Sequence, residues 1–448
     1  MRTWIGTIAV VVTLGAWTFG AAADDWPRFS GPKDNGMSAE TGIIDTFDEK
    51  GPEVLWERKM EPGFGGSAVF GGKIYVMDRV ADATDVLYCL DLASGKEEWK
   101  EQYDAPGKFG HPGARSTPAV DKDVIVTVGP MGDVRCWDRE KHTVLWGKDL
   151  LADWNEGKKT GMPMWAVAQS ALIVGDWVIL APQNGKVGVG AYEKKTGKPV
   201  WESKSVGSMA YASPRKVTLD GVDQIVMLAL DPGEMVRVTG LALKDGATLW
   251  EYKGGWKCKI PIATPTDLGD GRFFITAAYS AGCAMFKVKK DGDAWKVEQL
   301  YSDFDNSAYG KSEVKPNVQS WMHDAIYFNG HLYANSSTNG LGLVCLTPEG
   351  KLVWNSQKER RNDAPGNFDT GGPLLIVDGK IFILHGVTGE LFLAKATTEG
   401  YKELAKAKVL DGQGAQVWAT MTLSDGKLLV RDKHTLKCLN VKTKRLQS

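Results

Sequence analysis

The sequence predicts an all-β chain that folds as an eight-bladed β-propeller, with four-stranded antiparallel blades and a ring closed by an N-terminal strand. Three observations lead to this expectation. A unit of strand, turn and strand recurs about every fifty residues, hairpin patterns separate its copies, and segments with helical periodicity are almost absent. A four-stranded unit repeated at this spacing is typical of a propeller blade.

The recurring unit ends on a tryptophan and first occurs as CLDLASGKEEW at residues 89–99. Close variants are CWDREKHTVLW, AYEKKTGKPVW, ALKDGATLW and CLTPEGKLVW, and most carry a glycine four residues before the tryptophan. The glycine indicates a tight turn, so each copy reads as the third and fourth strands of a blade. We expect the fourth-strand markers to pack between neighbouring blades; they are Trp99, Trp146, Trp201, Trp250, Trp295, Trp354 and, in the seventh blade, Leu404.

Hairpins between these units supply the first two strands of each blade. β-Branched residues flank turns of two or three residues in SAVFGGKIYVMDR and in later segments of the same type. The eighth blade lacks a fourth strand at the C-terminus, and EVLWERKM, with Trp56 in the marker position, is expected to supply it. Such closure removes the open sheet edge of an incomplete ring. The eight hairpins begin near Ser67, Thr117, Ser170, Ser213, Thr264, Asp324, Gly372 and Trp418.

The expected organisation is a signal peptide over residues 1–23, a lead-in segment over 24–52 and the propeller over 53–448. An uncharged run follows Arg2, and its small terminal residues are typical of signal-peptidase cleavage after Ala23. This predicts a periplasmic or secreted protein with no transmembrane domain once the signal is removed. An uncleaved anchor is the alternative, because 21 uncharged residues could span a bilayer.

Charge and cysteine content exclude several functions. The formal net charge is -1, which gives no basic field for nucleic acid, so no nucleic-acid partner is expected. Of the six cysteines, Cys89, Cys136, Cys345 and Cys438 occupy equivalent strand positions in different repeats, where cysteine acts as a small buried residue. We therefore expect no structural disulfide and no zinc site.

The repeat unit resembles that of the PQQ-like β-propellers, a family named after pyrroloquinoline-quinone dehydrogenases. CLDLASGKEEW and AYEKKTGKPVW match the family pattern A-x-D-x-x-T-G-K-x-x-W closely, and WPRFSGPKDNGMSAETGI at residues 26–43 is similar to the lead-in of secreted members. The resemblance covers nearly all of the mature chain and implies the propeller fold. It implies no single function, because the matching residues are blade scaffold.

The family includes proteins with two different functions. Quinoprotein dehydrogenases bind PQQ and calcium and oxidise alcohols or sugars, whereas the assembly protein BamB and its relatives bind protein partners without a cofactor. This chain lacks the adjacent cysteines common in alcohol-oxidising quinoproteins, and it lacks the lipid-acceptor cysteine of the assembly lipoprotein. Neither specific role therefore carries over from the resemblance.

Candidate binding residues lie where long loops enter the first strands of the blades. These loops share one face of a propeller, and binding residues concentrate on loops of a rigid scaffold. Aromatic rings mixed with a guanidinium suit a small anionic or ring-shaped ligand, although individual residues could instead simply fill the channel. The candidates at the channel mouth are Arg115, Trp165, Gln169, Tyr211, Trp321, His323, Asp324, Asp369 and Trp418.

Two functions compete on this basis. The first is an exported binding or scaffold protein that takes a protein partner or a small ligand on its long-loop face. The alternative is a quinoprotein oxidoreductase, whose PQQ and calcium would need oxygen ligands such as Asp324, Asn367 and Asp369. The missing cysteine pair and the thin set of oxygens favour the first, and the repeat type, eight blades and aromatic mouth favour the second. No catalytic residue is assigned, and no facing carboxylate pair indicates a glycosidase or lyase.

Overall fold

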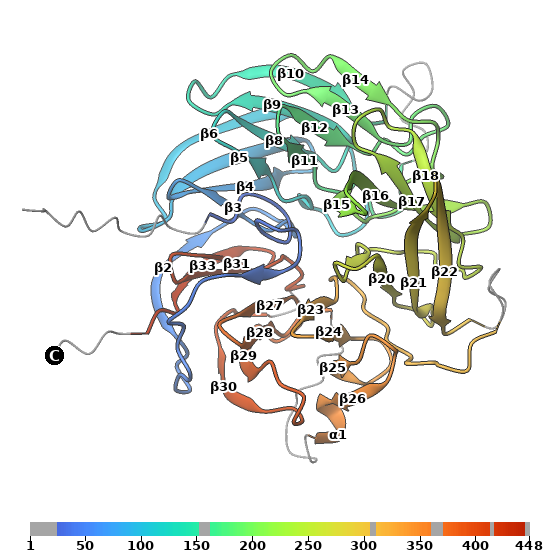
Figure 1. Cartoon of the computed structure of the whole chain (residues 1–448). Coiled ribbons are helices and arrows are strands. Elements are labelled where there is room, and N and C mark those ends of the chain that lie inside the picture. The colour runs from blue at the N-terminus through green and yellow to red at the C-terminus, as the bar shows by residue number, and fades with distance from the viewer. Residues whose placement is uncertain (1–24, 152–161, 305–310, 360–370, 413–415, 444–448) are drawn as a thin grey trace, which may run out of the picture.

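The computed structural model describes residues 25–151, 162–304, 311–359, 371–412 and 416–443, and the expected signal peptide lies outside them. The described strands form eight sheets arranged side by side around a ring (Figure 1). The predicted eight-bladed β-propeller is therefore confirmed. Within the described ranges, no helix has the length and apolar composition needed to cross a membrane.

The first four blades follow one another along the chain, each with its first strand innermost. Blade 1 contains β3 (Ala68–Phe70), β4 (Lys73–Val80), β5 (Thr84–Asp91) and β6 (Glu97–Asp104). Blade 2 contains β7 (Ala119–Val120), β8 (Val124–Val128), β9 (Asp133–Asp138) and β10 (Val144–Asp149). Blade 3 contains β11 (Leu172–Val174), β12 (Trp177–Leu180), β13 (Gly190–Glu193) and β14 (Pro199–Glu202). Blade 4 contains β15 (Arg215–Leu219), β16 (Val222–Asp231), β17 (Met235–Ala242) and β18 (Thr248–Tyr252).

The remaining blades complete the ring and include two strands from the N-terminal segment. Blade 5 contains β19 (Thr266–Asp267), β20 (Arg272–Ala277), β21 (Gly282–Asp291) and β22 (Ala294–Ser302). Blade 6 contains β23 (Ile326–Phe328), β24 (His331–Ser336), β25 (Gly342–Leu346) and β26 (Leu352–Asn355), followed by helix α1 (Ser356–Glu359). Blade 7 contains β27 (Leu374–Val377), β28 (Lys380–Leu384), β29 (Glu390–Lys395) and β30 (Glu403–Lys408), with β1 (Met37–Ser38) beside β27. Blade 8 contains β31 (Thr422–Ser424), β32 (Lys427–Arg431), β33 (Thr435–Asn440) and β2 (Glu53–Lys59).

Strand β2 closes the ring as the outermost strand of blade 8. It runs antiparallel to β33, with Trp56 opposite Cys438. On the inner side of the same seam, Arg431 of blade 8 forms an ion pair with Asp78 of blade 1, and both side chains are almost fully buried. Because the N-terminal strand β2 completes the last blade and a buried ion pair joins that blade to the first, the two ends of the ring are held together without a free edge.

Neighbouring blades are joined by an interblade clamp made of Trp56, Trp146, Trp201 and Trp354. Each indole lies on the outermost strand of one blade and donates its N–H to a carbonyl in the last turn of the next blade. The acceptors are Leu92, Lys194, Leu243 and Thr397, at distances of 3.0, 2.9, 2.7 and 2.8 Å respectively. The repeat glycine of that turn provides the seat for the ring, as at Gly197, where an added Cβ would lie 2.7 Å from the Trp146 indole.

The residue opposite each clamp indole is small, which explains the equivalent cysteines. Cys136 pairs with Trp146 and Cys345 with Trp354, and Ala191 occupies the same position opposite Trp201. A larger side chain there would collide with the indole of the adjoining strand. All six cysteines are buried and free, as small residues of separate blades.

The structure corrects two of the expected fourth-strand markers. Trp295 pairs with Lys290 near the tip of a long hairpin, whereas Tyr301 lies beside the β-bulge and takes the marker position. Tyr301 is 2% exposed, and its ring packs against Gly350 of blade 6. In blade 7, Ala405 rather than Leu404 occupies the marker position. The β21–β22 hairpin is longer than those of the other blades, so Trp295 lies near its tip and away from the marker position. The spacing of turns in the sequence does not reveal this extra length.

The lead-in is a structural part of the ring. Its residues 25–43, the plug segment, cross the centre along the innermost strands of the blades (Figure 1). Trp26 pairs with Val69 of blade 1, and Met37 pairs in parallel with Ile376 of blade 7. Trp26 is only 2% exposed, so the plug segment shares the core with the blades.

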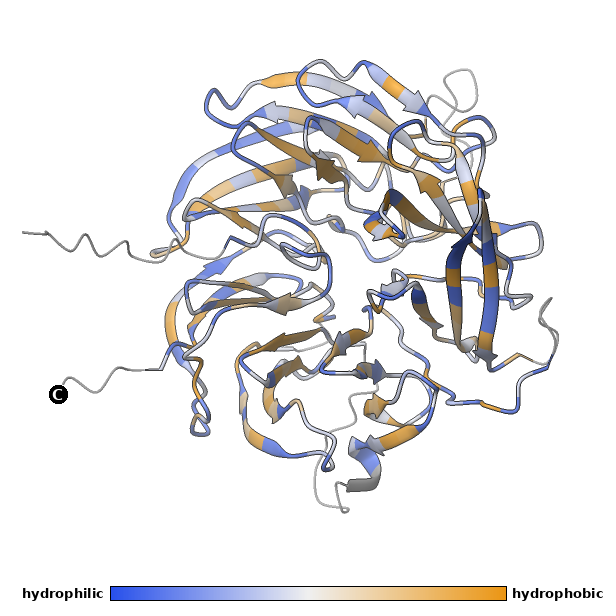
Figure 2. Cartoon of the chain, viewed as in Figure 1, coloured by the Kyte–Doolittle hydropathy of each residue, from blue (hydrophilic) through white to orange (hydrophobic). Residues whose placement is uncertain are grey.

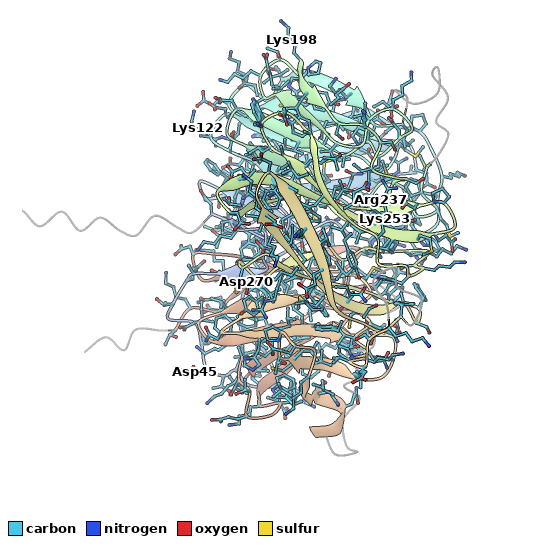
Figure 3. All side chains as sticks on the ribbon, turned by 45° about the vertical axis from the view of Figure 1, so that its right-hand side comes forward. Asp45, Lys122, Lys198, Arg237, Lys253 and Asp270 are labelled. Carbon is cyan, nitrogen blue, oxygen red and sulfur yellow. The ribbon has the colours of Figure 1, made fainter. Side chains whose placement is uncertain are left out.

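Polar side chains lie outside this core. The long β21–β22 hairpin alternates hydrophobic and hydrophilic residues, in keeping with one buried and one exposed face (Figure 2). Lys122 and Lys198 lie at the outer margin of the molecule and extend away from it (Figure 3). The turns between first and second strands, which include Lys122, form the turn face, opposite the loops that enter the first strands.

The interblade clamp predicts that replacing its turn glycine by alanine strongly lowers the free energy of unfolding. Gly197 has φ 68° and Gly379 has φ 71°, but a Cβ at Gly379 would have no neighbour within 4 Å. Both Gly197→Ala and Gly379→Ala should therefore incur about 1–2 kcal/mol of backbone strain. Gly197→Ala should lose a further ~1–3 kcal/mol because the Trp146 indole is displaced. Urea unfolding followed by circular dichroism measures this difference, and equal losses would contradict the clamp.

The cysteines predict slow thiol reactivity in the native protein. Burial raises the pKa of Cys89, Cys136 and Cys438 to about 12, so little thiolate is present at pH 8. Thiol titration without reductant should find slow reaction before denaturation and six free groups after it. Two or fewer free groups in the denatured protein would show that the blades bring cysteines together.

A candidate binding pocket on the loop face

A pocket lies at the centre of the loop face, where the loops enter the innermost strands. We use loop face for the side that carries the connections from fourth to first strands and from second to third strands. The pocket has a volume of about 180 Å³, and Phe29 of the plug segment contributes to its lining. Its lining residues are Phe29, Phe64, Gly66, His111, Arg115, Thr117, Trp165, Ala168, Tyr211, Ser213, Ile260, Ile262, Tyr279, Trp321, Met322, His323, Trp418 and Thr420.

Six of the nine candidates from the sequence meet at this pocket: Arg115, Trp165, Tyr211, Trp321, His323 and Trp418. Gln169 is absent from the lining and is 2% exposed, with its amide donating to the Ala181 carbonyl at 2.7 Å. Asp324 lies below the pocket, and Asp369 falls outside the described residues. For the six residues that do line the cavity, a role in ligand binding stays a prediction.

The walls of the pocket form a connected aromatic cluster. The centroid of the Trp418 ring lies 5.3 Å from Trp321, 5.3 Å from Phe64 and 5.5 Å from His111. Tyr279 meets Trp321 edge to face at 5.9 Å. These separations are those of favourable aromatic pairs, so the rings hold one another in place and leave a preformed cavity between them.

Three of the sixteen described non-glycine residues with a positive φ lie at the pocket. His111, Ala166 and Tyr279 have φ values of 54°, 64° and 57°, in the left-handed region that non-glycine residues seldom adopt. His111 and Tyr279 line the pocket, and Ala166 directly follows Trp165. Such conformations cost about 1–3 kcal/mol each and cluster at functional sites, which favours a binding role for this pocket.

Arg115 holds the loop that shapes one wall. Its Nε donates to the Trp165 carbonyl at 2.6 Å and its Nη1 to the Gly113 carbonyl at 2.9 Å. Its Nη2 donates to the carbonyls of Gly110 and His111, both at 2.7 Å. Four of its five N–H groups are thus used for local structure, which the sequence did not indicate.

The charge of Arg115 is not neutralised by these contacts. The acceptors are all neutral carbonyls, and within the described ranges no carboxylate forms an ion pair with it. Burial lowers the pKa of Arg115 to about 10, so the guanidinium remains protonated at neutral pH. The pocket wall therefore carries a positive charge without a fixed counterion.

His323 lies at the boundary between the pocket and the plug segment. It is 8% exposed, and burial lowers its pKa to about 4 despite a hydrogen bond to the Gly371 backbone. The imidazole is thus neutral at pH 6 to 8. Its Nε2 atom has no hydrogen-bond partner among the described residues. The His323 residue also lines a second cavity of about 20 Å³, large enough for one water molecule.

Asp324 is committed to holding the ring and the plug together. Its Oδ2 accepts a hydrogen bond from Arg215 at 2.8 Å, and its Oδ1 accepts one from the Thr264 amide at 2.6 Å. In the plug segment, Arg28 pairs with Asp34 at 2.6 Å. Burial raises the pKa of both carboxyl groups, and Arg215 acts against that shift in each. The buried Arg215–Asp324 pair and the partly buried Arg28–Asp34 pair lie close together beneath the pocket.

Several lining residues were missed by the sequence analysis. Phe64, Ile260 and Ile262 precede first strands, so the rule that selected Trp165 could have found them. Tyr279 lies between β20 and β21, in a connection that shares the loop face but was not searched. Phe29 gave no signal, because the repeat pattern does not reveal that the lead-in crosses the ring.

The lining does not fit a calcium-dependent quinone cofactor. The described lining residues include no carboxylate and no carboxamide, whereas calcium prefers six to eight oxygen ligands that include carboxylates. Across the described ranges, no group of three or more His, Cys, Asp or Glu residues could hold a metal ion. The described pocket can stack an aromatic group, but it offers neither a calcium site nor a carboxylate base.

The position of Asp324 predicts a structural effect of its removal. Asp324→Ala leaves Arg215 buried without a carboxylate, which should lower the free energy of unfolding by about 3–5 kcal/mol. Asp291→Ala serves as the control, because its exposed pair with Lys296 should contribute only about 0–1 kcal/mol. Urea unfolding of both variants tests this difference. Similar losses would show that the buried pair does not anchor the plug.

Comparisons with known proteins agree with this architecture. The chain matches the sequence model of a family described as outer membrane protein assembly factor BamB, over residues 40–128 and 107–255. BamB from Moraxella catarrhalis superposes with a TM-score of 0.57 at 13% identity, covering 87% of this chain and 99% of that one. Quinohemoprotein alcohol dehydrogenase from Comamonas testosteroni gives a TM-score of 0.62 at 13% identity, covering 95% and 82% respectively.

A europium-containing methanol dehydrogenase superposes with a TM-score of 0.60 at 12% identity, covering 91% of this chain and 89% of that one. A search of curated proteins gave no significant sequence match. Identities this low show a shared fold and leave the specific role open. The repeat unit, the eight-bladed ring and the family match together support the resemblance of the chain to the PQQ-like β-propeller family.

Proposed function

We propose that this propeller is an exported binding or scaffold protein that takes a protein partner or a small ligand on its loop face. The observation that carries the proposal is the composition of the central pocket. Its walls are aromatic and preformed, and no carboxylate or carboxamide occurs among its described lining residues. Such a cavity can hold an aromatic or apolar group, which is what a docking site requires.

Exposed apolar side chains around the pocket support a docking role. Tyr279 lines the pocket and is 56% exposed, and Met164, next to Trp165, is also 56% exposed. Large side chains of this kind lose unfavourable contact with water when a partner covers them. A protein bound over the pocket could therefore bury both residues together with the half-buried tryptophans.

The ends of the described chain leave the loop face accessible. Asp25 accepts a hydrogen bond from Gly71 in a turn between first and second strands, and Lys442 pairs with Ile43 of the plug segment. Both contacts are on the turn face, opposite the pocket. The described chain therefore begins at residue 25 and ends at residue 443 on the side away from the proposed binding surface.

Export is the part of the proposal that rests on sequence alone. The uncharged run after Arg2 and the small residues before Asp24 favour a signal peptide cleaved after Ala23. The proposed location is therefore the periplasm or the exterior of the cell.

A quinoprotein oxidoreductase remains the second candidate because of the shared eight-bladed fold. The donor set argues against it, since Asp324 is engaged below the pocket by Arg215 and Thr264. The cavity of about 180 Å³ is also close to the ~150 Å³ cavity that admits a single benzene ring. A fused three-ring quinone with several carboxylates would need the walls to move apart.

This view predicts no dehydrogenase activity from the reconstituted protein. The mature chain incubated with PQQ and calcium should give no dye-linked oxidation of primary alcohols or aldose sugars, because the described pocket supplies no calcium ligands and no carboxylate base. Weak PQQ binding without turnover agrees with this view. Turnover that disappears in Asp369→Ala would overturn it and establish the quinoprotein alternative.

Cross-linking tests the binding surface directly. Mature wild-type protein cross-linked in its native envelope should capture a partner, and Trp321→Ala/Tyr279→Ala should lose it because the aromatic wall is removed. Leu145→Ala is the matched control, since Leu145 is 37% exposed on the outermost strand of blade 2, away from the pocket. Identical cross-link profiles for all three proteins would remove the loop face as the docking surface.

A further inference from the structure

The residues that line the pocket define the chemical class of the group that it binds. This inference rests on the loop face being the binding surface proposed above. The size, the walls and the charge of the pocket are three separate constraints. Each constraint comes from different residues, so together they select a narrower ligand than the aromatic lining alone.

The space between the pocket walls has room for one or two fused rings. The cavity of about 180 Å³ is slightly larger than one that accepts benzene, and it is smaller than the ~300–1,000 Å³ of pockets for drug-sized molecules. The plug segment fixes this limit, because Phe29 is part of the lining and the buried ion pairs beneath it hold the segment in place.

The walls select a flat aromatic group. The rings of Trp321 and Trp418 meet at an interplanar angle of 62°, and Tyr279 adds an edge-to-face contact with Trp321 at 79°. A planar ligand can therefore stack on one ring and meet the edge of another, which is the preferred geometry on both sides. An aliphatic group would fill the space without these paired contacts.

Charge selects an anion over a cation. An aromatic cluster by itself would also suit a quaternary ammonium group. Here the Arg115 guanidinium lines the cavity, donates to four neutral carbonyls and lies over the Phe109 ring at 4.6 Å. Among the described lining residues no carboxylate is present to attract a cation. Of the five N–H groups of the Arg115 guanidinium, four have carbonyl acceptors, and one on Nη1 has none among the described residues. That group could donate to a carboxylate.

We propose that the pocket binds a small planar aromatic group that carries a carboxylate, with the ring held by Trp321 and Trp418 and the carboxylate paired with Arg115. Two sources share this chemistry. One is a free aryl carboxylate, and the other is an aromatic side chain next to an acidic residue in a segment of a partner protein.

Isothermal titration of the mature wild-type chain with three indole derivatives tests the proposal. Indole-3-acetate and indole-3-acetamide have nearly the same shape and differ in charge, and tryptamine carries the opposite charge on the same ring. We expect the acetate to bind at least tenfold more tightly than the acetamide, because a charge-assisted hydrogen bond is lost in the amide. Tryptamine should not bind measurably.

Variants locate the binding to the pocket. Trp321→Ala should weaken indole-3-acetate at least tenfold, whereas Trp295→Ala should not change it, since Trp295 lies on the outermost strand of blade 5. Circular dichroism and thermal melting of both variants show whether each is folded. Equal affinity for acetate and acetamide, tighter binding of tryptamine, no binding of any derivative, or equal effects of the two tryptophan variants would overturn the proposal.

Titrations with two short peptides distinguish a free aryl carboxylate from a segment of a partner protein. They also show whether the ligand class or the docking role has failed. A capped Gly-Asp-Trp-Gly peptide that binds more tightly than both indole-3-acetate and its Gly-Asn-Trp-Gly counterpart assigns the site to an acidic aromatic segment of a protein. The reverse order assigns it to a free aryl carboxylate. If no derivative or peptide binds while cross-linking still captures a partner through the loop face, the ligand class is overturned and the docking role stands.

Discussion

The contact between an indole on one blade and the last turn of the next blade is the interaction on which the ring depends. Trp146 shows it fully, with its N–H on the Lys194 carbonyl and its ring on Gly197. The contact recurs because the sequence repeats the same turn and the same tryptophan. It fixes the distance and orientation between blades at the four seams where a tryptophan donates to the next blade. Where the tryptophan is displaced, as in blade 5, Tyr301 takes its place.

The plug segment turns the resulting ring into a pocket with a floor. Its Arg28 and Asp34 lie close to Arg215 and Asp324 of the blades, so the charges beneath the pocket neutralise one another. This arrangement leaves Arg115 as the charged side chain in the pocket lining. The acidic residue that could have served a metal is used to hold the floor. The same network therefore shapes the floor of the cavity.

The sequence was sufficient for the ring because its signals are local and repeated. Turn glycines, alternating strands and the unpaired strand around Trp56 predicted eight blades and their closure, which the structure confirms. The site was harder to predict because it depends on contacts between distant segments. No local pattern showed that Phe29 would reach the pocket, that Asp324 would pair with Arg215, or that the Arg115 guanidinium would donate to loop carbonyls.

Amide hydrogen–deuterium exchange of the mature chain with and without indole-3-acetate tests most directly whether the loop face holds the binding site. The account predicts slower exchange in peptides covering residues 109–117, 162–169, 318–323 and 416–420, which contribute to the lining, and unchanged exchange in the turns of the opposite face. Protection on the turn face, or no protection anywhere at a saturating concentration of the probe, would contradict it.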